Sequence, residues 1–487
     1  MSAAGVAVVA RGWSWRHAGR ARRAVRELDL DIAAGERVLL LGASGSGKST
    51  LLQGLAGLLG GAEEGDEGGR LLVDGAPPVQ RRHRIGMVLQ NPDSQVILSR
   101  VGDDVAFGME NFNVERQAIW PRVRRALDAV GLALPLRRET ARLSGGQQQR
   151  LALAGVLAMN PGLILLDEPT ANLDPAGVLE VRDAVAAAVA QSGATLVVVE
   201  HRTEVWLPVV DRVVVLGADG ELIADGAPAD VIGTQRELLT RAGVWVPGVE
   251  LPAIARAAAV GAPLLHTADL TVGYPAGPPT PINDIEISRG ATTVVSGANG
   301  SGKSTLALTL GGLLPPRAGR VRADAELSPA VDRREPIAWR SRELLTRIGS
   351  VFQNPEHQFL TGSVRDELAC GPRALGRDAT TVAQLCDGLL ERLRLTGLAD
   401  ANPYTLSGGE QRRLSVATIL ATQPELIVLD EPTFGQDRTT WTELVRLLAE
   451  IVEAGTAVVA VTHDLLFAEL LADRHIELPT PDATETR

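Results

Sequence analysis

The stretch GASGSGKST, residues 42–50, decides the fold, and it returns almost unchanged as GANGSGKST at residues 297–305. Both copies fit the pattern GxxxxGK[ST], in which glycines let backbone N–H groups wrap around a phosphate. Each copy follows a short apolar run and opens a stretch typical of a helix, whose N-terminus adds partial positive charge. We therefore predict two phosphate-binding loops, each placed between a strand and a helix.

Lys48 and Lys303 are the only lysines in the chain, so the other 46 of its 48 basic residues are arginines (48 − 2). Arginine suffices wherever a surface charge is needed. A phosphate loop instead needs a compact ammonium group that fits among backbone N–H groups, and a planar guanidinium is wider. The two lysines therefore indicate that both loops are under chemical constraint.

The rest of the chain repeats in the same order. VLQNPDSQ, LSGGQQQR, LILLDEPT and VVVEHR return as VFQNPEHQ, LSGGEQRR, LIVLDEPT and AVTHD, and Gln90 and Gln353 lie 263 residues apart (353 − 90). Buried-strand patterns alternate with helical ones, which is typical of an α/β fold with a mainly parallel sheet. We predict two copies of one α/β domain at 1–240 and 264–478, a linker at 241–263 and a disordered tail at 479–487. The glycine-rich, acidic stretch at 60–70 is predicted to be a mobile loop.

Composition excludes several classes of protein. A net charge of −11 without a long basic block argues against nucleic acid as a partner. Cys370 and Cys386 form no CxxC pair, so neither a zinc site nor a disulfide framework is expected. We find no signal peptide and no uncharged apolar run near 18 residues, so another protein would have to hold this chain at a membrane.

The repeated motifs carry the residues of phosphate chemistry. The lysine of each loop would reach the β- and γ-phosphates, and the following serine would ligate Mg²⁺. Asp167 and Asp430 would hold Mg²⁺, and Glu168 and Glu431 would act as general bases. A strand that ends in an acidic turn is ordinary by itself, and only the phosphate loop upstream favours the catalytic interpretation. Ser-x-x-Gln and Ser-x-x-Glu in the LSGG motifs are also capping boxes, and both interpretations can hold together.

Taken together, the motifs resemble the ATP-binding cassette (ABC) family of P-loop NTPases, and the resemblance covers nearly the whole chain twice. It implies that each cassette has a parallel sheet with helices plus a helical signature subdomain, and that two cassettes pair head to tail around ATP. Ser144, Gly145 and Gly146 would then complete the site of Lys303. Ser407, Gly408 and Gly409 would complete the site of Lys48.

The family's other functional positions are carried over residue by residue. Gln90 and Gln353 match the glutamine that links Mg²⁺ to the membrane partner, and His201 and His463 match the γ-phosphate histidine. Trp15 and Tyr274 match the aromatic residue that stacks on adenine, although core packing also explains Trp15. The expected catalytic residues are Glu168, His201, Glu431 and His463. The expected metal ligands are Ser49, Gln90, Asp167, Ser304, Gln353 and Asp430. The expected ATP contacts are Trp15, Gly42, Ser44, Gly45, Gly47, Lys48, Ser49, Thr50, Ser144, Gly145, Gly146, Tyr274, Gly297, Asn299, Gly300, Gly302, Lys303, Ser304, Thr305, Ser407, Gly408 and Gly409.

Among ABC proteins, a transporter motor is favoured over ribosome-associated double cassettes and over DNA-repair or chromosome ATPases. The linker is short and mostly apolar, and no zinc module or heptad repeat occurs. The sequence around both glutamine motifs resembles energy-coupling-factor importers, which take up vitamins or transition-metal ions. The resemblance implies a motor at the cytoplasmic face of the membrane, working with a transmembrane coupling subunit and a substrate-binding membrane subunit. A sugar-type importer remains the alternative, and a soluble ribosome-acting ATPase remains a weaker one.

Four acids follow the glutamine motifs: Asp103, Asp104, Asp366 and Glu367. Each pair falls at an expected helix start, where the helix dipole favours negative charge. That local role can account for two of the four. The resemblance implies that such acids receive arginines from the coupling helices of the transmembrane subunit. The loop after the second carboxylate pair, Phe434-Gly435-Gln436-Asp437, departs from the ANLD of the first copy, which contains Asp174. This difference predicts asymmetric communication between the sites.

Overall fold

The computed structural model describes residues 5–20, 22–61, 64–90, 95–170, 173–251, 254, 260–275, 277–328, 333–433 and 435–479. Phe434 and the predicted tail from residue 480 onward lie outside the described residues. The chain divides into two compact units, Met1–Glu250 with Asp437–Thr439, and Leu251–Gln436 with Thr440–Arg487.

The first unit is built on a six-stranded sheet in the order β5-β6-β7-β3-β8-β9. Its first five strands are parallel, and only β9 runs antiparallel to its neighbour. The predicted mainly parallel sheet is confirmed. The strands are β3 (Arg37–Gly42), β5 (Ile85–Val88), β6 (Leu163–Asp167), β7 (Thr195–Val199), β8 (Arg212–Leu216) and β9 (Leu222–Gly226).

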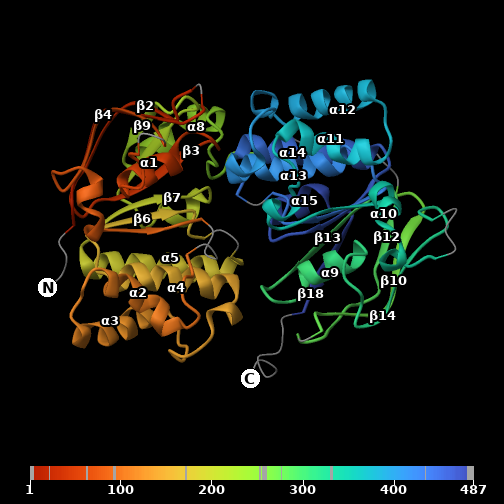
Figure 1. Ribbon diagram of the computed structural model, residues 1–487, viewed down its shortest axis with the longest axis horizontal. Coiled ribbons are helices and arrows are strands. Elements are labelled where there is room, and N and C mark those ends of the chain that lie inside the picture. Colours follow the sequence, from red (N-terminus) through yellow and green to blue (C-terminus); the bar gives the residue numbers. More distant parts are fainter. Residues whose placement is uncertain are drawn as a thin grey trace. The chain divides into compact units, whose positions relative to one another are not determined.

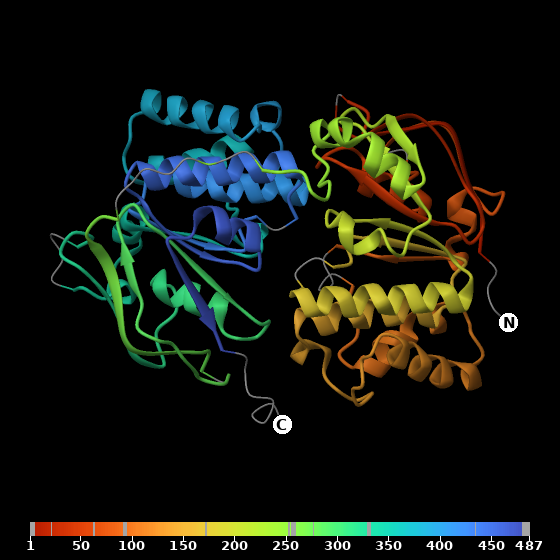
Figure 2. The ribbon, with the colours of Figure 1, turned by 180° about the vertical axis from the view of Figure 1, so that it is seen from behind.

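Both faces of this sheet are covered, which explains why its strands are continuously apolar. In β3, Leu39 and Leu41 pack in the cluster that includes four helices, whereas Val38 and Leu40 pack in the opposite cluster. Figures 1 and 2 show the four helices on one side of β6 and β7, with α1 on the other. The first layer contains α2 (Val101–Asn111), α3 (Arg116–Ala129), α4 (Gly145–Ala158) and α5 (Pro175–Ser192). The second contains α1 (Lys48–Leu55) and the antiparallel sheet β2-β1-β4, of β1 (Val8–His17), β2 (Val25–Ile32) and β4 (Gly65–Val73).

The prediction of a mobile loop throughout residues 60–70 is wrong for its second half. Gly65 already belongs to β4 and pairs with His17 of β1. The glycines misled the prediction because they serve close backbone packing. A Cβ on Gly65 would lie 2.2 Å from the carbonyl oxygen of Arg16, and one on Gly69 would lie 2.2 Å from that of Gly12. Only glycine fits this strand where it crosses its neighbour so closely.

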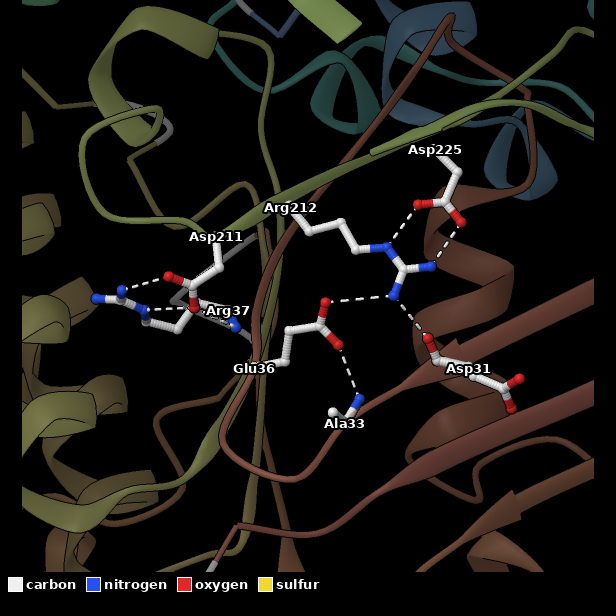
Figure 3. Close-up of polar contacts among 7 residues, drawn as sticks. All are labelled: Asp31, Ala33, Glu36, Arg37, Asp211, Arg212 and Asp225. Atoms are coloured by element: carbon white, nitrogen blue, oxygen red, sulfur yellow. Dashed lines mark hydrogen bonds and ion pairs between the residues drawn. The ribbon is translucent and has the colours of Figure 1, made fainter. Parts of the chain in front are cut away.

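A network of ion pairs links the strands of the first unit's sheet at the end away from the phosphate loop. Figure 3 shows the residues of this network. Arg212, which begins β8, binds both carboxylate oxygens of Asp225 in β9, at 2.5 and 2.6 Å. It also donates to the carbonyl oxygen of Asp31, at 2.8 Å, and contacts Glu36 at 3.2 Å. Arg37 and Asp211 tie the starts of β3 and β8 together in the same way. These forked contacts fix the start of β3, whose other end leads into the phosphate loop.

The second unit repeats this architecture with a five-stranded parallel sheet in the order β15-β16-β17-β13-β18. Its strands are β13 (Thr292–Gly297), β15 (Ile348–Val351), β16 (Leu426–Asp430), β17 (Ala457–Val461) and β18 (Arg474–Leu478). A four-stranded antiparallel sheet covers one face together with α9 (Lys303–Leu310). It contains β10 (Pro263–Val272), β11 (Thr280–Pro281), β12 (Glu286–Ser288) and β14 (Ala318–Ala323).

The second unit's remaining helices include a helical layer that corresponds to α2–α4 of the first unit. Leu368, Cys386 and Leu414 pack together from three of its helices. The layer contains α11 (Val364–Ala374), α12 (Ala379–Arg392) and α13 (Gly408–Leu420), and Leu447 joins it from α14 (Arg438–Glu453). The other helices are α10 (Ser341–Arg347) and α15 (Leu465–Leu471) here, and α6 (Thr203–Trp206), α7 (Pro228–Thr234) and α8 (Arg236–Arg241) in the first unit. Among the described residues, no helix has both the length and the apolar character needed to span a membrane.

Candidate functional site

The two glycine-rich loops have the same backbone shape and hold their lysines in the same way. Gly47 and Gly302, which cap α1 and α9, have φ values of 89°, a conformation that favours glycine. The Nζ atom of Lys48 donates to the carbonyl oxygens of Gly42 and Ala43, at 2.9 and 2.7 Å. Lys303 makes the matching pair of contacts at 2.8 and 2.9 Å. Each ammonium therefore lies across its own loop, where a phosphate could bind it.

Lys48 is almost fully enclosed, with 6% of its surface exposed. Burial lowers the pKa of its ammonium group, and the nearby Glu168 carboxylate opposes that shift. A bound phosphate would place negative charge beside the buried ammonium and would stabilise its charged form. The loop is thus suited to an anion rather than to a neutral ligand.

Glu168 and Glu431 follow the ends of β6 and β16 in a left-handed backbone conformation, with φ values of 48° and 50°. Non-glycine residues rarely adopt this conformation, which costs about 1 kcal/mol or more. The same strained conformation occurs at the same place in both units. This indicates that the position it gives the glutamate side chain matters more than the energy that a relaxed backbone would save. It turns each glutamate out of the strand and toward the histidine of the neighbouring strand.

In the first unit, two side chains hold the Glu168 carboxylate. Gln90 donates through Nε2 to Oε2 at 2.7 Å, and His201 Nε2 lies 3.2 Å from Oε1. Burial is the largest influence and pushes the pKa of Glu168 upward, but His201, Lys48 and Gln90 together outweigh it, so that the pKa lies below its ordinary value. Three residues from three separate motifs therefore meet at one carboxylate, which is kept ionised and ready to accept a proton.

In the second unit, the Glu431 carboxylate is held differently. Oε2 accepts from the hydroxyl of Thr462 at 3.0 Å and from the backbone N–H of His463 at 3.3 Å. The imidazole of His463 lies farther away, with Nε2 3.8 Å from Oε1, and instead contacts Asn299 Oδ1 at 3.1 Å. Burial and the Asp430 carboxylate raise the pKa of Glu431 to about 7. The two candidate bases therefore differ in charge near neutral pH.

The difference between the two glutamate environments arises partly at the residue before each histidine. VVVEHR and AVTHD differ at this position, but the motifs alone did not mark it as functional. Glu200 stands where the second copy has Thr462. Its carboxylate is buried, accepts from the Thr170 hydroxyl, and accepts from the backbone N–H of His201 at 2.9 Å. Burial raises the pKa of Glu200, and the Glu168 carboxylate adds to the shift. The backbone N–H of His201 is thus bound by Glu200, whereas the backbone N–H of His463 is bound by the candidate base Glu431 itself.

The donor set beside each phosphate loop fits Mg²⁺. Ser49 hydrogen-bonds Asp167, and burial together with Glu168 raises the pKa of that aspartate to about 6. Ser304 makes the same contact with Asp430, whose buried Oδ1 atom has no hydrogen-bond partner among the residues that the structure describes. Hydroxyl and carboxylate oxygens are the ligands that Mg²⁺ prefers. No cluster of three or more acidic, histidine or cysteine residues that could hold a metal occurs among the described residues.

The signature residues occupy helix starts, as the capping-box interpretation predicts. Ser144 precedes α4, and its N–H donates to Gln147 Oε1 at 3.1 Å. Ser407 precedes α13, and its N–H donates to Glu410 Oε2 at 2.8 Å. The glycines that follow each serine form the first turn of these helices.

The structure argues against Trp15 as the residue that stacks on adenine. Trp15 is 1% exposed and packs in the core beside the sheet, so neither face of its ring is open to a base. Its Nε1 donates to His17 Nδ1 at 3.3 Å, and His17 Nε2 lies 3.0 Å from the hydroxyl of Thr50. The half-buried His17, two residues later in β1, is therefore the ring beside the phosphate loop. Tyr274 in the second unit is 54% exposed directly after β10.

Two of the four acids proposed for docking accept hydrogen bonds from nearby backbone N–H groups instead. Asp104 Oδ1 accepts from the backbone N–H groups of Ile97 and Leu98, both at 2.8 Å. Glu367, 3% exposed, accepts from those of Leu360 and Thr361, at 2.9 and 2.7 Å. These carboxylates hold the loop that precedes each helix in place. The prediction that Asp104 and Glu367 receive arginines of a partner is therefore replaced by this structural role. Asp103 and Asp366 are exposed, and Asp366 is paired with Arg373 on its own helix.

The raised pKa of Glu431 predicts a pH-dependent effect on stability. A carboxyl group whose folded pKa, about 7, lies above its unfolded value contributes stability at low pH that is lost as the pH rises through 7. Glutamine resembles the protonated acid and does not ionise. In the nucleotide-free chain, Glu431→Gln should therefore be stabilising at pH 8, by on the order of 3 kcal/mol, and much less so at pH 5. Thermal unfolding at the two pH values measures the difference.

The matched control is Glu391→Gln, which changes an exposed glutamate of α12. Its effect on the melting temperature should be small and the same at pH 5 and pH 8. An equal effect of Glu431→Gln at both pH values would contradict the assignment of a proton to the buried carboxyl group.

Comparison with known proteins identifies two matching segments. The family model described as "ABC transporter" matches residues 25–171 and 283–434. A protein of Bifidobacterium longum, named as an ABC transporter ATP-binding protein, is 36% identical over 96% of this chain and 64% of its own length. This chain therefore spans slightly less than two thirds of that relative. A protein of Bacillus subtilis, named as an HMP/thiamine import ATP-binding protein, is 34% identical over 92% of this chain and 85% of its own length.

Solved structures resemble the chain in fold. An RNase-L inhibitor superposes with a TM-score of 0.60 at 21% identity, covering 95% of this chain and 87% of that chain. A model of ribosome-bound archaeal Pelota and ABCE1 gives a TM-score of 0.66 at 20% identity, covering 96% of this chain and 76% of that chain. At such identities the likeness supports the α/β double-cassette fold alone.

Proposed function

This chain belongs to the ABC transporter family and carries two of its ATPase cassettes, and from this membership we propose that it is the motor of an energy-coupling-factor importer. The cassettes would be residues 1–240 and 264–478, joined by residues 241–263. The cargo would be a vitamin or a transition-metal ion. The likeness to a Bacillus subtilis relative named for HMP/thiamine import supports import and favours a vitamin.

The proposed chemistry is hydrolysis of ATP by a water molecule. Lys48 and Lys303 would bind the β- and γ-phosphates, and bound Mg²⁺ would neutralise charge on the phosphate oxygens. Glu168 or Glu431 would accept a proton from the attacking water, and His201 or His463 would contact the γ-phosphate. The meeting of Gln90, His201 and Glu168 at hydrogen-bonding distance is the observation that carries this assignment.

Each glutamine would report the state of its site to the membrane partner. Gln90 contacts the candidate base directly, and Ile97, seven residues later in the chain, is 59% exposed. In the second cassette the equivalent Leu360 is 79% exposed. Ser144–Gly146 and Ser407–Gly409 would each close over ATP bound by the other cassette. Closure of both sites would then move the loops that the membrane partner contacts.

For the nucleobase, we assign Tyr274 in the second cassette and His17 in the first. His17 is the ring that contacts Thr50 at the start of α1, whereas Trp15 is enclosed. Loss of an aromatic contact should weaken ATP binding severalfold. Unchanged ATP affinity in a His17→Ala variant, measured with the second site blocked by Lys303→Ala, would remove His17 from the site.

The importer proposal is tested by purifying the tagged full chain from membranes of its own host. We expect a small polytopic coupling protein and a small apolar substrate-binding membrane protein to co-purify. The chain would be held at the cytoplasmic face by these two partners. Recovery with a periplasmic-type sugar-binding system would favour a sugar importer, and recovery with ribosomes would contradict import.

The exposed acids at the start of α2 and α11 give a sharper test. Asp103→Arg together with Asp366→Arg should abolish co-purification with the coupling protein, because the two introduced guanidinium groups would repel the partner's arginines, which the native carboxylates would receive. ATP binding should persist. The matched control is Asp128→Arg, an exposed charge reversal on α3. Unchanged co-purification of the double variant would exclude these two acids as the docking point.

A further inference from the structure

In the second cassette, α13 is hydrogen-bonded to the segment that carries Gln353, residues 352–360, which we call the Gln353 loop. Gln358 is held twice, because its Oε1 accepts from the Ser415 hydroxyl at 2.7 Å and its Nε2 donates to Thr418 Oγ1 at 2.9 Å. Gln411 Nε2 donates to Glu356 Oε1 at 3.2 Å. The helix that begins at the signature glycines therefore holds this loop by side-chain contacts along its length.

Arg412 makes the contact that reaches farthest. Its Nη1 donates to the carbonyl oxygen of Phe352 at 2.8 Å, and its Nη2 donates to that of Gln353 at 2.5 Å. Nη1 also lies 3.3 Å from the carbonyl oxygen of Asp430, the last residue of β16. The side chain is 4% exposed. Burial lowers the pKa of its guanidinium to about 10, so it remains charged at neutral pH.

In the first cassette, the described residues show no such connection. Position 412 corresponds to 149 (412 − 263), where Gln149 is 1% exposed and, within the described part of the chain, neither polar atom of its side chain has a partner. Gln95, the counterpart of Gln358, turns to its own segment. It accepts from Leu89 N–H at 2.8 Å and donates to the carbonyl oxygen of Met87 at 3.0 Å.

We infer that Arg412 is a positioning residue that ties the Gln353 loop to the end of β16, so that in the second cassette the loop, the signature helix and the catalytic carboxylates move together. This inference rests on the proposed function for the roles of Gln353 and Glu431. Removing the guanidinium takes a charged donor away from three backbone carbonyl groups, those of Phe352, Gln353 and Asp430. The Gln353 loop and the strand end at Asp430–Glu431 then lose the contact that ties them together, so each can move independently of the other.

The test compares Arg412→Gln, which introduces the first cassette's residue, with the native full chain. Hydrogen–deuterium exchange should rise at least tenfold at backbone amides of the Gln353 loop and of Asp430–Glu431. Exchange in the rest of α13 and in the first cassette should stay unchanged. The kcat of ATP hydrolysis should fall severalfold, and the loss should not exceed the turnover that the second site contributes. KM should stay within about twofold of the native value, because the ATP contacts are untouched.

The matched control is Gln149→Leu, which replaces the unpartnered carboxamide by an apolar group of similar size. Exchange at residues 85–90 and kcat should both stay within twofold of native. Unchanged exchange in the Gln353 loop of Arg412→Gln would overturn the inference. So would a uniform rise across the whole second cassette, since that marks a purely structural role. If the native chain did not hydrolyse ATP, the proposed function would fail, while the exchange measurement would still decide whether Arg412 ties the loop.

Discussion

Replacing both Glu168 and Glu431 with glutamine should lower kcat for ATP hydrolysis by about a thousandfold while leaving ATP bound. The two carboxylates lie at matching strand ends, in the same strained conformation, and each contacts the histidine motif of the next strand. Glutamine keeps their shape and hydrogen-bond acceptor but cannot take a proton. The measurement is phosphate release together with equilibrium binding of radiolabelled ATP.

The single variants divide this effect between the sites. Each should retain turnover from the other site, because each cassette has its own lysine, carboxylate pair and histidine. Complete loss in Glu168→Gln alone would show that the sites do not work independently. A double variant that kept more than a tenth of native turnover would exclude these glutamates as general bases.

The second large effect is expected at the two lysines. Lys48→Arg and Lys303→Arg should each weaken ATP binding at the altered site by about a hundredfold, although both substitutions conserve charge. Each ammonium fits between two carbonyl oxygens of its own loop within 3 Å, and Lys48 is nearly fully buried. The wider guanidinium would displace the loop. Titration with a fluorescent ATP analogue measures the loss.

The reverse exchange provides the control. Arg11→Lys changes an arginine of an exposed ion pair with Asp31, where either cation can serve. ATP affinity and turnover should stay at native values. A fully active Lys48→Arg, Lys303→Arg double variant would refute the interpretation that lysine is retained for the phosphate loops.

Much of the fold could be predicted because its signals are local. Each phosphate-loop motif predicts a strand before it and a helix after it. Uninterrupted apolar strands indicate a sheet that is covered on both faces. β3 and β13 end at Gly42 and Gly297, where the two predicted phosphate loops begin. Repetition of the motifs then implies two units with one architecture, as observed.

The errors share a physical cause, because each depends on what a side chain meets across space. Trp15 has the right chemistry for a base but points into the core, whereas His17 reaches the phosphate loop. Asp104 and Glu367 have the charge expected of a docking site but satisfy nearby backbone N–H groups. The difference between Gln149 and Arg412 is visible in the sequence, but its meaning depends on the carbonyl groups around it.

The left-handed backbone at Glu168 and Glu431 also bears on how this protein would respond to directed evolution. Glycine or asparagine would relieve the conformational cost of about 1 kcal/mol at each position. A library selected for heat resistance alone should therefore accumulate those residues at 168 and 431. A library selected for ATP turnover should retain glutamate. At these two positions, thermal stability and ATP turnover favour different residues.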